Sequence, residues 1–168
     1  AEPGPFLTPS IQCLAGAPSL SDEQRKQILQ KFHSVAPLNS RDDLLAANLE
    51  LQLHPDQGLE IYEHTIARWS HGADADRVEL ARWLNLHRQV ERVLSLRPAD
   101  ETLRNNQLLL ARFDARALLQ RWSEIDELLQ RPEVTLDPSV LECFRARNAQ
   151  SQYRPLEAEL HWDRAVTL

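Results

Sequence analysis

Glycine is scarce in this sequence of 168 residues, which contains four: Gly4, Gly16, Gly58 and Gly72. Because these glycines are scattered, the chain has no phosphate-binding loop, no dinucleotide fingerprint and no Gly-x-Ser-x-Gly nucleophile elbow. Leucine and alanine dominate instead, and runs of β-branched residues are few. This composition favours α-helices over turn-rich β-sheets.

The cysteines and histidines are not spaced as in known metal-binding motifs. The two cysteines, Cys13 and Cys143, lie far apart, and no Cys-x-x-Cys motif occurs. None of the six histidines belongs to a His-Glu-x-x-His motif or follows a glutamate by three residues, as in di-iron bundles. We therefore expect no metal, no cofactor and no enzymatic activity. Unpaired thiols are the expected state of both cysteines, with one disulfide in an oxidising compartment as the alternative.

Long apolar stretches and basic runs are absent as well. No run approaches the roughly 18 apolar residues of a membrane-spanning helix, so we expect no membrane insertion. The net charge of −6 argues against nucleic acid or an anionic membrane as a partner. Because the chain starts at Ala1 and contains neither a methionine nor a signal peptide, we expect a fragment of a longer or processed protein. The sequence favours a cytoplasmic location and leaves open a periplasmic domain of an anchored protein.

The first 20 residues differ in composition from the rest. They hold four of the ten prolines and two of the four glycines, residues that interrupt helices. We therefore predict an extended leader or linker over residues 1–20. Its apolar residues either pack along the first helices or belong to a connection from a preceding domain.

From residue 21 onward, apolar residues recur at the spacing of amphipathic helices. Ser21 and Gln24 form a capping-box pattern, and Asp137 followed by Pro138 is typical of a helix start. Breaks at proline, glycine and capping residues divide the chain into predicted helices at 21–36, 40–53, 56–69, 75–84, 90–96, 100–119, 122–130, 138–146 and 155–168. This order predicts an all-α domain over 21–168, with one helix followed by about four helical hairpins.

The hairpin near the start carries a recognisable pattern. Leu45, Ala46 and Leu49 form a large-small-large set, and Gly58, Tyr62 and Thr65 form a small-aromatic-small set in the next helix. Ala158, Trp162 and Ala165 repeat the second set in the last predicted helix. With its hairpins of thirty-odd residues, the segment 39–168 resembles the tetratricopeptide repeat (TPR) family. The middle departs from the family pattern, because arginines replace apolar residues there.

The resemblance implies a right-handed α–α superhelix whose first helices line a concave face that binds a peptide or helix of a partner. A compact helical bundle is the alternative fold. Polar residues on the predicted first helices are the candidates for partner binding, and the arginines among them suit an acidic or C-terminal carboxylate ligand. These residues are Asn48, Arg82, Asn105, Arg112 and Arg116.

Two other functions fit the same pattern. The array could space or oligomerise neighbouring domains, in which case an exposed apolar face on the last helix would self-associate. It could also be an accessory domain of a larger multidomain protein. The arginine-rich, lysine-poor composition, with only Lys26 and Lys31, fits a GC-rich bacterial genome. On all three interpretations the binding candidates could instead be ordinary solvated helix faces.

Two carboxylate–histidine pairs and four tryptophans complete the set of candidate groups. Glu60 with His64, and Glu157 with His161, are four residues apart, so each pair shares a helix face that could bind a metal or move a proton. Solvated surface pairs are the expected interpretation. The tryptophans are expected to pack in the core rather than to line a ligand groove. They are Trp69, Trp83, Trp122 and Trp162.

Overall fold

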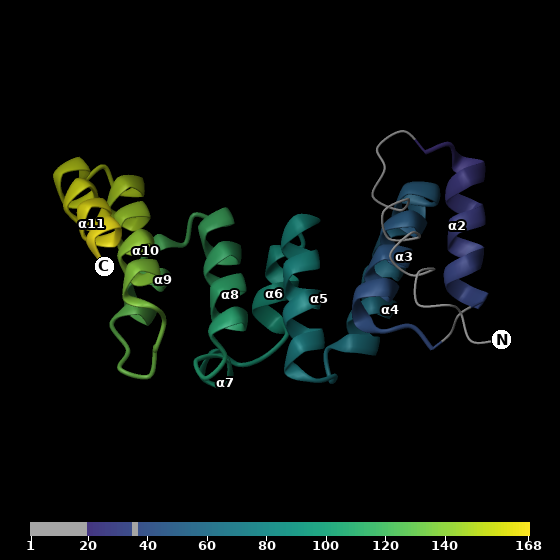
Figure 1. Ribbon diagram of the computed structural model, residues 1–168, viewed down its shortest axis with the longest axis horizontal. Coiled ribbons are helices and arrows are strands. Elements are labelled where there is room, and N and C mark those ends of the chain that lie inside the picture. Colours follow the sequence, from purple (N-terminus) through teal and green to yellow (C-terminus); the bar gives the residue numbers. More distant parts are fainter. Residues whose placement is uncertain (1–19, 35–36) are drawn as a thin grey trace. The chain divides into compact units, whose positions relative to one another are not determined.

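The computed structural model describes residues 20–34 and 37–168, and within them all regular secondary structure is helical (Figure 1). The all-α prediction is thereby confirmed. The chain divides into two compact units, unit 1 (Ala1–Leu80) and unit 2 (Ala81–Leu168), which are described in turn. The predicted leader, apart from Leu20, lies outside the described residues, and so does Cys13.

Unit 1 contains α2 (Asp22–Ser34), α3 (Ser40–Leu53), the short 3-10 helix η1 (Pro55–Gln57) and α4 (Gly58–Trp69). The predicted capping box is present: the Ser21 N–H donates to Gln24 Oε1 at 2.8 Å, and the Gln24 N–H donates to Ser21 Oγ at 3.3 Å. Asn39 caps α3 by accepting from the N–H of Asp42 at 2.9 Å. Local sequence therefore sets where these two helices begin.

The core of unit 1 lies between α2 and α3, with α4 packed against α3. Ile28 and Phe32 from α2 meet Ala46 and Leu49 from α3, and Leu49 has no exposed surface. Asp43 ties α3 to α4 through its two oxygens. The Arg68 guanidinium lies 2.8 Å from Oδ1, and the indole N–H of Trp69 donates to Oδ2 at 2.7 Å. The boundary between the units falls within α5 (Asp74–Leu86).

Unit 2 continues with α6 (Val90–Ser95), α7 (Ala99–Thr102), α8 (Asn106–Leu118), α9 (Trp122–Leu129), α10 (Pro138–Ser151) and α11 (Pro155–Thr167). The prediction of one helix over 100–119 is wrong, because the chain breaks between α7 and α8. The backbone of Asn105 is extended there, and its side chain accepts from the N–H groups of Gln107 and Leu108, both at 3.1 Å. This amide cap starts a new helix inside a continuous apolar pattern.

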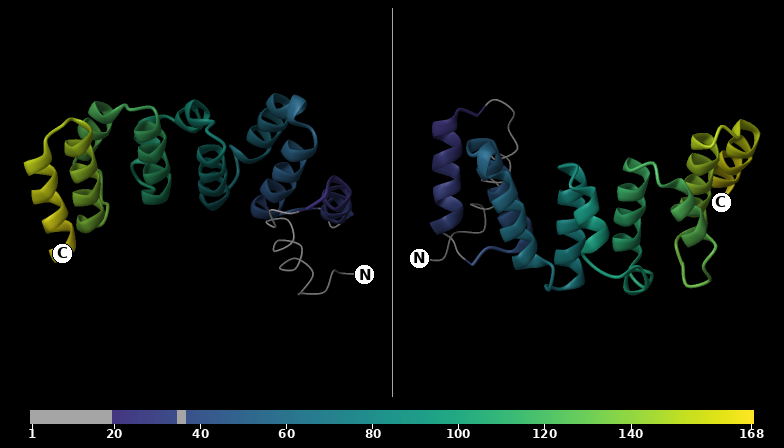
Figure 2. Two further views of the ribbon diagram at one scale, coloured as in Figure 1. Left: turned by 90° about the horizontal axis from the view of Figure 1, so that it is seen from above. Right: turned by 180° about the vertical axis from the view of Figure 1, so that it is seen from behind.

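The core of unit 2 gathers side chains of α8, α9 and α10. Phe113 and Ile125 have no exposed surface, and the Phe113 ring meets that of Phe144 edge to face with centroids 4.9 Å apart. Helices α10 and α11 pack side by side as a hairpin, shown in green and yellow in all views of Figures 1 and 2. No helix of the described residues is both long enough and apolar enough to span a bilayer.

One turn recurs three times in unit 2. Arg88, Gln120 and Tyr153 each have a positive φ of about 60°, and they are spaced 32 and 33 residues apart. In each case the N–H of the next residue bonds to a carbonyl five residues back, as in a Schellman cap. The next helix begins at once, at Val90, Trp122 or Pro155. The same helix ending is thus reused at nearly constant spacing.

Candidate binding site

Three of the predicted binding residues have structural roles in unit 2. Asn105 is the cap of α8, while Arg112 and Arg116 are only 6% and 7% exposed. The Arg112 guanidinium donates to the carbonyl of Arg97 at 2.5 Å, and Arg116 Nε donates to Glu124 Oε2 at 3.1 Å. Burial, together with the nearby charge of Arg116, lowers the pKa of Arg112 to about 10.

The other two candidates do not complete a site around these arginines. Arg82 is exposed on α5 in unit 2, and Asn48 is half-buried on α3 in unit 1. Arg112 and Arg116 contact each other, with Arg116 Nη1 donating to the carbonyl of Arg112 at 3.5 Å. The interruption of an apolar pattern by arginine therefore reflects internal hydrogen bonding, a role that the sequence pattern did not separate from partner binding.

Unit 1 contains a pocket of about 290 Å³ formed by α2, α3, η1 and α4. Leu29 and Ile61 supply its apolar wall. Its polar groups come from α3, from the α3–α4 connection and from one face of α4: Glu50, His54, Gln57, Glu60 and His64. We call this set of seven residues the unit 1 pocket.

Most of its polar side chains are available to a ligand. His54, Gln57, Glu60 and His64 are exposed, and none bonds to or pairs with another side chain of the described chain. Glu50 is half-buried, with its Oε1 3.5 Å from Nε2 of His33. The predicted Glu60–His64 pair therefore faces a cavity, and no hydrogen bond joins its two members within the described residues.

The pocket carries negative charge. Two carboxylates line it, and neither lysine nor arginine is among its lining residues. A smaller cavity of about 160 Å³ adjoins it and shares Glu50 and His64. Arg68 lines that second cavity, but its charge is held by Asp43 at 2.8 Å. Within the described residues, neither carboxylate of the unit 1 pocket is thus paired with a lysine or an arginine.

A metal site does not fit this arrangement. Among residues 20–34 and 37–168, no three histidine, cysteine, aspartate or glutamate side chains lie close enough to share a metal ion. The five polar side chains around the cavity can instead offer hydrogen-bond acceptors to an organic group, together with the two negative charges of Glu50 and Glu60. The chemistry of the pocket lining therefore suits an organic ligand better than a metal ion.

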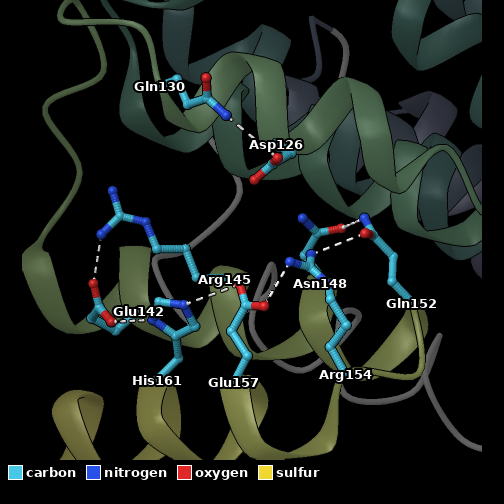
Figure 3. A network of polar contacts seen from close by, with 9 residues as sticks. All are labelled: Asp126, Gln130, Glu142, Arg145, Asn148, Gln152, Arg154, Glu157 and His161. Carbon is cyan, nitrogen blue, oxygen red and sulfur yellow. Dashed lines mark hydrogen bonds and ion pairs between the residues drawn. The ribbon is translucent and has the colours of Figure 1, made fainter.

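The second carboxylate–histidine pair belongs to a network between α10 and α11 (Figure 3). His161 points from α11 toward Glu142 of α10, with Nδ1 2.6 Å from Oε2, and its Nε2 lies 3.9 Å from Oε1 of Glu157. The other oxygen of Glu142 accepts from Arg145 at 2.6 Å. The Glu142 side chain is 8% exposed and that of His161 is 14% exposed. This network joins α10 to α11 through side chains that bond to one another.

The hydrogen bonds of that network lower the pKa of Glu142. Burial alone would raise the pKa of this carboxyl group, but the hydrogen bonds from His161 and Arg145 outweigh burial and place it below the usual glutamate range. The ionised form of Glu142 is therefore the form that the fold stabilises.

The four tryptophans differ in how far they are buried. Trp83 is 5% exposed, which confirms core packing for that residue, and its ring lies 4.9 Å from that of His87 at an interplanar angle of 56°. Trp69 and Trp122 are half-buried, whereas Trp162 is 38% exposed on α11. Large apolar side chains are also exposed along and beside α11: Tyr153, Leu156, Leu160, Val166 and Leu168.

Comparisons with known proteins add no relative. The chain matches no protein-family model, and no curated protein or solved structure shows detectable similarity to it. The site must therefore be interpreted from its own chemistry.

Proposed function

We propose that this chain is a protein-interaction module, a TPR-like array of helical hairpins without catalytic activity of its own. The helix ending that recurs at 32 and 33 residues supports a repeat. Two of the small residues in the pattern support close helix packing, because Thr65 and Ala158 are buried. Gly58 adds no support, since a Cβ there would meet Leu51 at an ordinary 3.6 Å. The right-handed superhelix is part of the same proposal.

The observation that carries the binding function is the unit 1 pocket. A cavity formed by α2, α3, η1 and α4, with four exposed polar side chains that have no partner within the described residues, is the default location for a ligand. Together with the adjoining cavity it offers room for more than one side chain of an extended segment or helix. An acidic partner is less well supported, because the Arg112 and Arg116 guanidiniums are used internally.

Blocking the pocket tests this function. Gln57→Trp places a large side chain at the pocket, and Gln30→Trp places the same side chain on an exposed part of α2 that does not line it. Each protein is immobilised and used to capture proteins from a lysate of the source cells, followed by quantitative mass spectrometry. We expect a partner captured by the parent and by Gln30→Trp but lost by Gln57→Trp. Equal capture by all three, or capture by none, contradicts the proposal.

A second candidate function is a spacer or oligomerisation array, favoured by the apolar side chains exposed on α11. Leu156 is 82% exposed and Val166 is 87% exposed, and exposed apolar groups on a terminal repeat normally pack against a neighbour. Light scattering after size exclusion distinguishes this function. A dimer that becomes monomeric in Leu156→Gln/Leu160→Gln supports self-association, whereas a monomer at every accessible concentration removes it.

A further inference from the structure

We propose that the unit 1 pocket receives a basic side chain, an arginine first of all, from a protein partner. This inference rests on the proposed function, because it names the partner chemistry of the same site. It replaces the acidic partner that the arginines of the sequence suggested with a partner of opposite charge.

Charge is the first argument. The carboxylates of Glu50 and Glu60 approach the cavity from α3 and α4, and no arginine or lysine lines it. Neighbouring cations are already held elsewhere: Arg68 by Asp43 and Arg25 by Asp22, both at 2.8 Å. A ligand cation would therefore meet two carboxylates, of which Glu60 has no partner within the described residues and Glu50 has His33 Nε2 at 3.5 Å, whereas an anionic side chain would be repelled.

The acceptors around the cavity also suit a guanidinium. Its five N–H donors need several acceptors in different directions. The pocket supplies the carboxylate oxygens of Glu50 and Glu60, the amide oxygen of Gln57 and the imidazole rings of His54 and His64. An ammonium has three donors and no planar fork, so lysine would satisfy fewer of these groups at once.

Size and the apolar wall complete the argument. About 290 Å³ lies just below the range of cavities that hold whole cofactors or drug-sized ligands, and it suits one side chain. Ile61 is 9% exposed and Leu29 is half-buried, so they offer a surface for the methylene stem of arginine while the charged head reaches the carboxylates.

The test uses the full 168-residue chain and N-acetyl-arginine amide as the probe. Backbone amide signals are followed by NMR during titration at low salt, with neutral N-acetyl-glutamine amide as the ligand control. For a ligand of this size we expect a dissociation constant on the order of 1 mM, with shifts in residues 50–64. Glu50→Gln/Glu60→Gln should weaken binding about tenfold, because hydrogen bonds to charged groups are lost.

A matched variant controls for net charge. Glu23→Gln/Glu63→Gln removes the same charge from exposed positions of α2 and α4 outside the pocket lining, and it should bind the probe like the parent. Absence of saturable shifts, equal shifts with the neutral amide, or equal weakening in both double variants overturns the inference. If a partner from the Gln57→Trp capture experiment is still retained by Glu50→Gln/Glu60→Gln, the basic-side-chain assignment fails while the proposed interaction function stands.

Discussion

Carboxylates, histidines and arginines of the two compact units differ in whether their side chains are buried with an internal partner or are exposed at a cavity. In unit 2, Arg112, Arg116 and Glu142 are nearly inaccessible and each has an internal hydrogen-bond partner. In unit 1, Glu60 and His64 face a cavity and have no partner within the described chain. Both regions present carboxylates and histidines four residues apart, so composition alone does not distinguish them.

The difference separates groups that hold the fold from groups that are available to a ligand. A buried charge that loses its partner lowers the free energy of unfolding, so such groups are needed for stability. An exposed polar group around a cavity contributes little to stability and can serve recognition. The comparison therefore predicts large stability effects in unit 2 and small ones at the pocket.

The largest effect is expected for Arg112→Glu. The variant removes the hydrogen bond to the Arg97 carbonyl and places a shorter carboxylate side chain in a buried position, at a cost of about 3 kcal/mol. Arg82→Glu makes the same charge change at an exposed position and should alter stability by about 0.5 kcal/mol or less. Urea unfolding followed by circular dichroism compares them. Similar stability of the two variants would show that Arg112 is not a structural residue.

His161→Ala should have the next largest effect. The variant leaves the Glu142 carboxylate buried without its 2.6 Å partner, which we expect to cost about 2 kcal/mol. The matched change His64→Ala removes an exposed imidazole that has no partner in the described chain, and a change of about 0.5 kcal/mol or less is expected. Hydrogen exchange is the suitable measurement, because it reports local opening of α10–α11 and of α4 separately. Unchanged protection of α10–α11 in His161→Ala would contradict the role of the network.

Acid should weaken the α10–α11 hairpin through Glu142. Because its pKa is lower in the folded chain than in the unfolded one, its stabilising contribution is complete above about pH 4.3 and is lost as the pH falls through the folded value. The parent should therefore lose more stability between pH 6 and pH 3 than Glu142→Gln, which cannot ionise. Urea unfolding at both pH values gives the two losses, and equal losses would remove Glu142 as the responsible group.

The smallest expected effect is a gain in stability, from a substitution of Tyr153. Tyr153 has a φ of 58°, a conformation that favours glycine, and its side chain is 93% exposed. Tyr153→Gly should therefore stabilise the α10–α11 turn by about 1 kcal/mol. Tyr153→Ala, which removes the ring but keeps the Cβ, should give no such gain. Thermal unfolding compares the three proteins, and a gain shared by both variants would point to the exposed ring instead of the backbone.

Most helices were predictable from sequence because their starts are encoded locally. The Ser21–Gln24 capping box and the Asp137–Pro138 start are both present, and the last helix begins at Pro155 as expected. The break before α8 was missed because the apolar pattern continues across Asn105. The turns at Arg88, Gln120 and Tyr153 fall in breaks that were predicted between helices. Their shared left-handed conformation was not predicted, because a non-glycine residue with positive φ leaves no signal in the sequence.

The binding site was less predictable, because it depends on contacts between elements distant in the chain. Spacing correctly grouped Glu60 with His64, but it could not show that Glu50 and His54 join them around a cavity. Nor could it show that Arg112 reaches the carbonyl of Arg97. Helical periodicity places a residue on a face, whereas the availability of its side chain depends on what packs against that face.

The central claim is that the Glu50 and Glu60 carboxylates of the unit 1 pocket are available for binding, whereas the Glu142 carboxylate of unit 2 stabilises the fold. Urea unfolding of Glu50→Gln/Glu60→Gln beside Glu142→Gln tests it most directly. We predict that the pocket variant retains the stability of the parent within about 0.5 kcal/mol and that Glu142→Gln loses about 2 kcal/mol. A loss of about 2 kcal/mol or more in the pocket variant, with little change in Glu142→Gln, would contradict the account.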